Sequence, residues 1–200
     1  MFFRVCQMLF YLFFKLLFRF EVSGLENIPN KGAVVIASNH LSNWDPPVIG
    51  CPLPRMINFM AKEELFKIPV FGWVIRKFKA FPVRRDNADR AAIRAALDIL
   101  AKGEILGIFP EGTRSKTGQL GDVGQGTAFI IARSGATVVP TALIATNKMF
   151  SLKGGFLPKI KVKFGKARTF APDKADRQTL AQISGVIREE ILRLQKESEN

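Results

Sequence analysis

Short apolar runs alternate with segments of helical periodicity along most of this chain. Runs such as AVVIAS at residues 33–38 have no polar face, which is typical of strands buried on both sides of a sheet. The helical segments carry one apolar stripe, as in residues 176–195, where Leu180, Ile183 and Ile187 share a side. This alternation predicts an α/β fold with a mostly parallel or mixed central sheet covered by helices.

The pattern also sets approximate element positions. The expected strands are residues 33–38, 56–60, 81–84, 105–109, 137–145 and 159–164. The expected helices are residues 86–103, 126–134 and 176–195. Asp86 is placed to cap the first of these helices and Gly103 to end it. Residues 21–31 read as a turn-rich connection, and no repeat, low-complexity tract or linker divides the remainder.

Residues 1–20, MFFRVCQMLFYLFFKLLFRF, are the most apolar segment of the chain. One narrow polar stripe is formed by side chains at helical spacing: Arg4, Gln7, Tyr11, Lys15 and Arg19. The uncharged run at 5–14 is shorter than the ~20 apolar residues of a bilayer-spanning helix. No small-residue cleavage site follows it, as one would in a signal peptide. We expect an amphipathic helix at 1–20 lying in a membrane interface, or alternatively a core helix, followed by one domain at 21–200.

The net charge of +13 and pI of about 10.1 indicate an anionic partner. Phospholipid fits better than nucleic acid, because the chain has 18 Phe against two Trp and a single Tyr, and no nucleic-acid motif is present. The chain has two scattered cysteines and one histidine, which indicates neither a disulfide framework nor a zinc site. We therefore expect a reducing compartment, no metal and no bound cofactor.

The only histidine, His40, lies in SNHLSNWD at residues 38–45, just past an expected strand. Carboxyl ends of strands are where ligands gather in α/β sheets. Asp45 could hold one imidazole nitrogen and leave the other as a base for a substrate hydroxyl. The alternatives are that His40 is structural and that Asp45, followed by Pro46, only caps a helix. Spacing alone leaves these open.

Two further polar clusters follow expected strands. Residues 108–115, IFPEGTRS, combine a carboxylate, a glycine, hydroxyls and the Arg114 guanidinium, a set suited to a phosphate and neighbouring hydroxyls. Residues 81–85, FPVRR, end in two cations. Each could also be an ordinary solvated turn. Three such clusters at three strand ends favour a shared site.

The motifs N-H-x4-D at 39–45, F-P-V-R-R at 81–85, F-P-E-G-T-R-S at 109–115 and V-V-P-T-A-L at 138–143 occur in this order. Together they resemble the glycerolipid acyltransferase family over residues 25–170. The second motif departs from the family pattern at Lys79 and Arg84, so that either Arg84 or Arg85 could face the site. Val123 to Gly126 stand where family members often have a lysine.

The resemblance implies that His40 is the general base, oriented by Asp45, for attack of the sn-2 hydroxyl of lysophosphatidate on an acyl thioester. The donor would be acyl-CoA or acyl carrier protein, and the enzyme would sit peripherally or monotopically on the cytoplasmic face of an anionic membrane. Oxyanion donors are expected among backbone amides near His40 or at a helix N-terminus. The substrate-binding residues it implies are Lys62, Arg85, Glu111, Gly112, Thr113 and Arg114.

Alternatives remain at this point. The acceptor could be glycerol 3-phosphate or another lysophospholipid. A non-enzymatic, basic phospholipid-binding protein is the less favoured reading.

Overall fold

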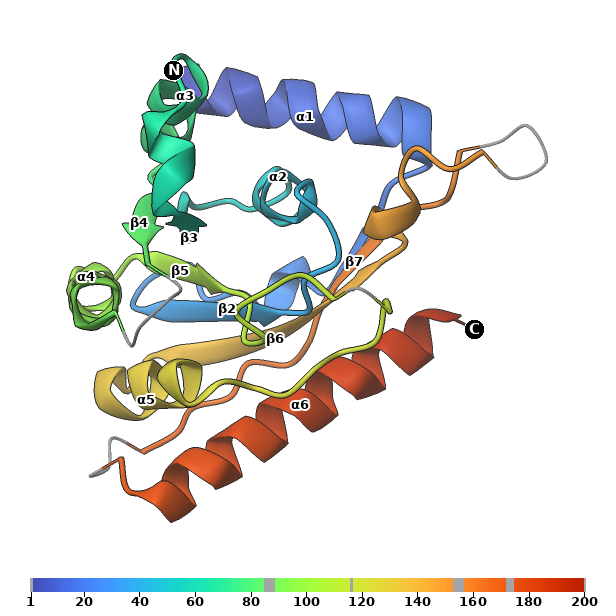
Figure 1. The fold of residues 1–200 in the computed structure, drawn as a ribbon. Coiled ribbons are helices and arrows are strands. Elements are labelled where there is room, and N and C mark those ends of the chain that lie inside the picture. Colours follow the sequence, from blue (N-terminus) through green and yellow to red (C-terminus); the bar gives the residue numbers. More distant parts are fainter. Residues whose placement is uncertain (1, 85–88, 116, 153–156, 172–174, 200) are drawn as a thin grey trace.

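The computed structural model describes residues 2–84, 89–115, 117–152, 157–171 and 175–199, which form an α/β fold around one seven-stranded sheet (Figure 1). The strands are β1 Glu21–Ser23, β2 Val34–Ser38, β3 Ile57–Lys62, β4 Phe81–Val83, β5 Ile105–Ile108, β6 Thr137–Ile144 and β7 Lys161–Phe164. Their order is β1-β7-β6-β2-β5-β3-β4, and only the β6–β7 pair is antiparallel. The predicted mostly parallel or mixed sheet is confirmed.

Helices cover both faces of the sheet. They are α1 Phe2–Phe18, α2 Asp45–Gly50, α3 Phe71–Lys77, α4 Arg90–Ala101, α5 Gln125–Ser134 and α6 Arg177–Glu199. Short 3-10 turns lie at η1 Leu25–Asn27, η2 Glu63–Lys67 and η3 Thr146–Lys148. Figure 1 shows α1, α2 and α3 on one side of the sheet, opposite α5 and α6.

The central strand β2 divides the core in two. Val34 and Ile36 point into the cluster that contains the buried side chains of α1 and α2. Val35 and Ala37 point into the cluster formed with α4, α5 and α6. Because successive side chains of a strand face opposite sides, the uninterrupted apolar run AVVIAS serves both layers at once.

Two details differ from the sequence prediction. The turn-rich reading of residues 21–31 missed β1, which pairs in parallel with β7, a strand far along the chain. Helix α4 begins at Arg90, and its N-cap is Asp89, whose carboxylate accepts the Ala91 and Ala92 amides. The predicted cap, Asp86, lies outside the described residues.

Helix α1 has two apolar sides. Phe14 and Phe18 are fully buried in the core beneath the helix, as a core helix requires. Leu9, Leu12 and Leu16 on its outer side are exposed. Among the described residues, no helix is long and apolar enough to cross a membrane.

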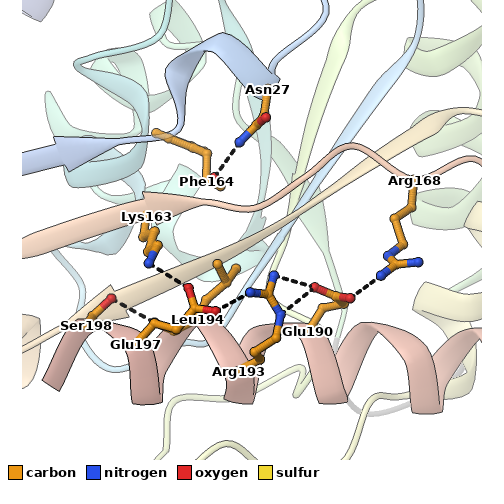
Figure 2. Close-up of polar contacts among 9 residues, drawn as sticks. All are labelled: Asn27, Lys163, Phe164, Arg168, Glu190, Arg193, Leu194, Glu197 and Ser198. Atoms are coloured by element: carbon orange, nitrogen blue, oxygen red, sulfur yellow. Dashed lines mark hydrogen bonds and ion pairs between the residues drawn. The ribbon is translucent and has the colours of Figure 1, made fainter. Parts of the chain in front are cut away.

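The long helix α6 is fastened to the sheet by ion pairs (Figure 2). Lys163 of β7 pairs with Glu197 at 2.7 Å, and Arg168 pairs with Glu190. Arg193 bridges Glu190 and Glu197 along the helix. These pairs are mostly exposed and individually weak, so the burial of Ile183, Ile187 and Ile191 beneath them supplies most of the stability.

A pair of glycine substitutions tests the close approach of η1 to β7. Gly24 and Gly32 both have positive φ, 78° and 83°, but a Cβ at Gly24 would lie 1.9 Å from the Phe164 carbonyl oxygen, whereas one at Gly32 meets nothing within 4 Å. We expect Gly32→Ala to lower the free energy of unfolding by ~1–2 kcal/mol, from its backbone alone. Gly24→Ala should lower it by about 2 kcal/mol more, through the added clash. Urea unfolding of the two variants measures the difference, and equal losses would contradict the packing described.

Candidate active site

Two of the three polar clusters predicted from the sequence, those that follow β2 and β5, meet at one edge of the sheet. Strands β2, β3, β4, β5 and β6 run in the same direction, so their carboxyl ends lie together. His40 follows β2, and the loop carrying Glu111 to Ser115 follows β5, the neighbour of β2. This is the edge at which open α/β sheets bind ligands.

Asp45 organises the turn that carries His40. Its Oδ2 accepts from His40 Nδ1 at 2.7 Å, from Leu41 N at 2.6 Å and from Ser42 N at 2.8 Å. The alternative that Asp45 only caps a helix is wrong: α2 has Trp44 at its N-cap without a side-chain cap bond, and Asp45 is the first helical residue. The carboxylate instead folds the preceding loop back, and this brings residues five apart into contact.

This arrangement fixes the tautomer of His40. Because Asp45 Oδ2 already accepts from two amides, it acts as an acceptor toward His40 as well, and Nδ1 is the protonated nitrogen. The lone pair is then on Nε2, which no described residue hydrogen-bonds. Asp45 is fully buried, and its Oδ1 has no hydrogen-bond partner among the described residues. A buried carboxylate oxygen without a partner is costly and is typical of functional sites.

Stacked rings hold the imidazole from the side. The Phe109 ring lies 3.9 Å from the His40 ring at an interplanar angle of 12°. Phe59 stacks behind Phe109 at 5.7 Å. Gly107 leaves room for this stack, since a Cβ there would lie 2.3 Å from the Phe59 ring.

Glu111 ties the two motif-bearing loops together. Its Oε1 accepts from the His40 amide at 2.9 Å, and its Oε2 accepts from the Gly121 amide at 3.1 Å. In the other direction, the Ser115 amide donates to the His40 carbonyl at 2.8 Å. Both oxygens of Glu111 thus hold backbone, and contact with substrate remains a prediction for this residue.

Asn39 anchors the other flank of the site. Its side-chain amide donates to the Leu143 carbonyl at 2.9 Å, and its Oδ1 accepts from the Leu143 amide at 2.8 Å. This side chain closes a two-way link to β6, within the fourth motif. Sequence reasoning gave no role to Asn39 or Phe109, although both stand inside quoted motifs. Gly121 had no sequence signal.

The backbone geometry narrows the search for oxyanion donors. The amides of His40, Leu41 and Ser42 donate to Glu111 and Asp45. They are therefore occupied, and these three amides near His40 are not free to bind an oxyanion.

The remaining predicted residues surround this centre less tightly. Gly112 has a φ of 70°, and Thr113 and Arg114 are exposed on the same loop. Among the described residues, Arg114 has no ion-pair partner. Lys62 pairs with Glu64 at 3.3 Å and makes no contact with the loop carrying Glu111 among the hydrogen bonds of the described chain. Arg85 lies outside the described residues.

Arg84 lies next to this position and is engaged elsewhere. Its Nε donates to Glu63 Oε2 at 2.7 Å, and this bond raises the pKa of the guanidinium. Nowhere in the described ranges do three or more His, Cys, Asp or Glu side chains gather as they would to hold a metal ion.

A histidine–carboxylate pair lies at the carboxyl edge of an α/β sheet, and no described residue hydrogen-bonds its second imidazole nitrogen, an arrangement that can accept a proton at Nε2. The sequence profile of the Acyltransferase family matches residues 19–144. The chain belongs to this family, which agrees with the resemblance seen in its motifs.

Individual relatives carry more specific names. The protein named 1-acyl-sn-glycerol-3-phosphate acyltransferase from Bacillus subtilis is 39% identical over 124 residues, which are 61% of this chain and 61% of that protein. The chloroplastic LPAT1 of Arabidopsis thaliana, with the same activity in its name, is 33% identical over 66% of this chain and 38% of that protein. The chain thus spans less than two thirds of the length of these relatives.

A solved structure has the same fold. The crystal structure of the 1-acyl-sn-glycerophosphate acyltransferase PlsC from Thermotoga maritima superposes with a TM-score of 0.70 at 28% identity, covering 88% of this chain and 72% of that one. The similarity therefore extends beyond residues 19–144.

The backbone role of Glu111 can be tested by Glu111→Gln. Glutamine carries an NH2 group where glutamate has its second oxygen, and this NH2 group cannot accept from a backbone N–H. One of the two bonds is therefore lost, and the free energy of unfolding should fall by about 1–3 kcal/mol. Amide hydrogen exchange at His40 or Gly121 should become faster. Glu64→Gln, a change of the same kind at an exposed ion pair, is the matched control and should leave both amides protected. Unchanged exchange in Glu111→Gln would contradict the described bonds.

Cys51 reports on the packing of α2. Its thiol is buried at the end of the helix, and burial raises its pKa to about 12. In a Cys6→Ser variant, where Cys51 is the only thiol, iodoacetamide at about pH 8.5 should label the folded protein far more slowly than the urea-unfolded protein, because the thiolate is the reactive form. Because the buried thiol is harder to ionise than the unfolded one, the free energy of unfolding should be unaffected by this group below the unfolded thiol pKa of ~8.5 and should fall as pH rises from there toward about 12. Equal labelling rates would show that α2 is open.

Proposed function

We propose that this protein transfers an acyl group from an acyl thioester to the sn-2 hydroxyl of lysophosphatidate. The observation that carries the proposal is the His40–Asp45 pair at 2.7 Å, with Nε2 unbonded, in a chain of the Acyltransferase family. Lysophosphatidate is proposed as the acyl acceptor because relatives of the chain are named 1-acyl-sn-glycerol-3-phosphate acyltransferase.

The proposed chemistry uses His40 twice. Nε2 takes the proton of the sn-2 hydroxyl as the hydroxyl oxygen bonds to the thioester carbonyl carbon. The resulting tetrahedral intermediate collapses, the carbon–sulfur bond breaks, and the leaving thiolate takes the proton from the imidazolium. Asp45 holds Nδ1–H throughout and stabilises the cationic ring.

The loop at Gly112 to Arg114 supports a phosphate-binding role. It is tied to His40 at Glu111 and Ser115, so its free groups keep a fixed place relative to the base. Arg114 is exposed and offers a planar fork of N–H donors to a phosphate. We propose that Gly112, Thr113 and Arg114 bind the glycerol phosphate.

Lys62 and Arg85 are proposed as further phosphate ligands. The Lys62–Glu64 pair is exposed on both sides, and such pairs are weak enough to exchange for a phosphate. Arg85 is proposed from its motif alone. The acyl donor is proposed to be acyl-CoA or acyl carrier protein, and no bound cofactor or metal enters the scheme.

Membrane contact follows from the substrate, which resides in a bilayer. We propose that the protein binds peripherally or monotopically to the cytoplasmic face of an anionic membrane through α1. The exposed outer side chains of this helix and the net charge of +13 support this.

The test is phosphatidate formation from lysophosphatidate, with acyl-CoA and acyl carrier protein offered separately. His40→Ala should lose about 10²–10⁴-fold in rate, the usual share of a general base. Its thermal unfolding should stay close to that of the wild type. Gln182→Ala, an exposed substitution on α6 away from the dyad, is the control and should keep full activity.

Equal rates for wild type and His40→Ala would remove His40 from the mechanism. Product from glycerol 3-phosphate or another lysophospholipid, and none from lysophosphatidate, would reassign the acceptor. Lipid binding without product from any acceptor would favour a binding protein.

A further inference from the structure

The exposed large apolar side chains of the described residues gather in three segments. Six are on α1, at Val5, Met8, Leu9, Leu12, Leu16 and Leu17. The others are Ile68, Val70, Phe71 and Trp73 around the start of α3, and Phe150 and Leu152 after η3. We call these twelve side chains the apolar face.

Aromatic contacts join the three segments into one surface. Phe3 and Phe10 of α1 contact Phe78 at the end of α3, at 5.9 and 6.5 Å. At the other end of α1, Phe18 contacts Phe150 at 5.9 Å. Figure 1 shows α1 and α3 together on the side of the molecule opposite α6. These contacts place the α3 and η3 segments, which are far from α1 in the sequence, next to the two ends of α1.

Within the segments that carry the apolar face, every charged side chain is a cation. Residues 65–77 contain Lys67, Arg76 and Lys77, and residues 145–152 contain Lys148, with no Asp or Glu in either segment. Lys77 lies 5.6 Å from the Trp73 ring, and Arg76 lies 5.2 Å from the Phe66 ring. Phe66 is buried, but Trp73 is exposed, and a cation beside an exposed ring matches the headgroup zone of an anionic bilayer, where aromatic side chains sit below the lipid phosphates.

The backbone at Val70 adds a second observation. Val70 has a φ of 63°, a conformation that β-branched residues rarely adopt, and its side chain is 77% exposed. The backbone strain of Val70 is present in any medium and marks a conformation that the surrounding structure imposes. The exposure of Val70 and Phe71 is unfavourable in water, and insertion of both side chains into hydrocarbon would relieve that cost.

We propose that the segments 68–73 and 150–152 insert into an anionic phospholipid bilayer beside α1, so that the protein docks through three elements. The inference rests on the proposed function, which assigned membrane contact to α1 alone. Phe150 contacts Trp44 at 5.8 Å, and Trp44 directly precedes Asp45. Three-part docking thus brings the carboxyl edge of the sheet to the headgroups, where the glycerol hydroxyl of a lysophospholipid lies.

Depth measurement tests the new contact directly. The chain has two tryptophans, so Trp44→Phe leaves Trp73 as the only one. With vesicles of phosphatidylcholine and 30% phosphatidylglycerol that carry brominated acyl chains, Trp73 emission should shift to the blue and be quenched. Pelleting of the protein with the vesicles without quenching of Trp73 would overturn the proposal and leave binding through α1 intact.

Matched substitutions separate the three elements. Phe71→Ser and Leu152→Ser should each weaken vesicle binding about tenfold, comparable with Leu16→Ser on α1, since each removes an exposed apolar side chain of similar size. Arg76→Glu with Lys77→Glu should weaken binding to the anionic vesicles by about tenfold or more. The same charge reversal at Arg90 and Arg94 on α4 is the control and should have a smaller effect.

Sensitivity of binding to Leu16→Ser alone would overturn the proposal. A monomer in wild type and in all variants by sedimentation is expected. If Phe71→Ser abolishes a dimer and leaves vesicle binding unchanged, the apolar face binds a second copy and the proposal fails. Acyl transfer to a short-chain, water-soluble lysophosphatidate reports the chemistry independently of docking. Wild-type protein that is active on this substrate but does not bind vesicles would overturn the membrane proposals and leave the proposed acyl transfer intact.

Discussion

The rest of the structure depends on the burial of β2 from both sides. This strand pairs in parallel with β5 and β6, and all five of its residues are buried. A parallel strand in this position requires a helical layer above and below. The layer of α4, α5 and α6 covers one face, and α1 with α2 covers the other. The apolar N-terminal segment is thus needed by the sheet, whatever else it contacts.

Two carboxylates convert this scaffold into a site. Asp45 gathers three N–H donors of the turn after β2, and Glu111 joins that turn to the loop after β5. Bonds from amides to a charged acceptor are roughly twice as strong as neutral ones, which suits them to fixing loops. The imidazole is held at its backbone, at Nδ1 and along its face by Phe109. No described residue hydrogen-bonds Nε2, so this nitrogen is the ring atom that can accept a proton from a substrate.

Much of this could be predicted from local pattern, and the remainder depended on contacts distant in sequence. The buried runs and the helical stripes predicted the sheet class. The pairing of His40 with Asp45 was left open by spacing alone and was expected from the resemblance to the acyltransferase motifs. Strand β1 was missed because its three residues are stabilised by pairing with β7 rather than by any pattern of their own. The hydrogen bonds from the His40 and Gly121 amides to Glu111 were missed for the same reason. The sequence around a carboxylate in a turn does not indicate which backbone amides will donate to it. For residues 1–20 the sequence offered a core helix and a membrane-interface helix as alternatives. It did not show that one helix would be apolar both on the side packed in the core and on the exposed side.

Because α1 is apolar on both sides, it cannot be treated as a removable anchor. Cutting it away to obtain a protein that needs no detergent would uncover the upper face of the sheet, including the surfaces against which Phe14 and Phe18 lie. Such a truncation removes the exposed apolar side of α1 but exposes the apolar side chains of the core that α1 covers. A variant with higher solubility would have to keep the whole helix and replace only its exposed leucines. The substitutions would therefore be chosen by the side of the helix on which a residue lies rather than by its position along the chain.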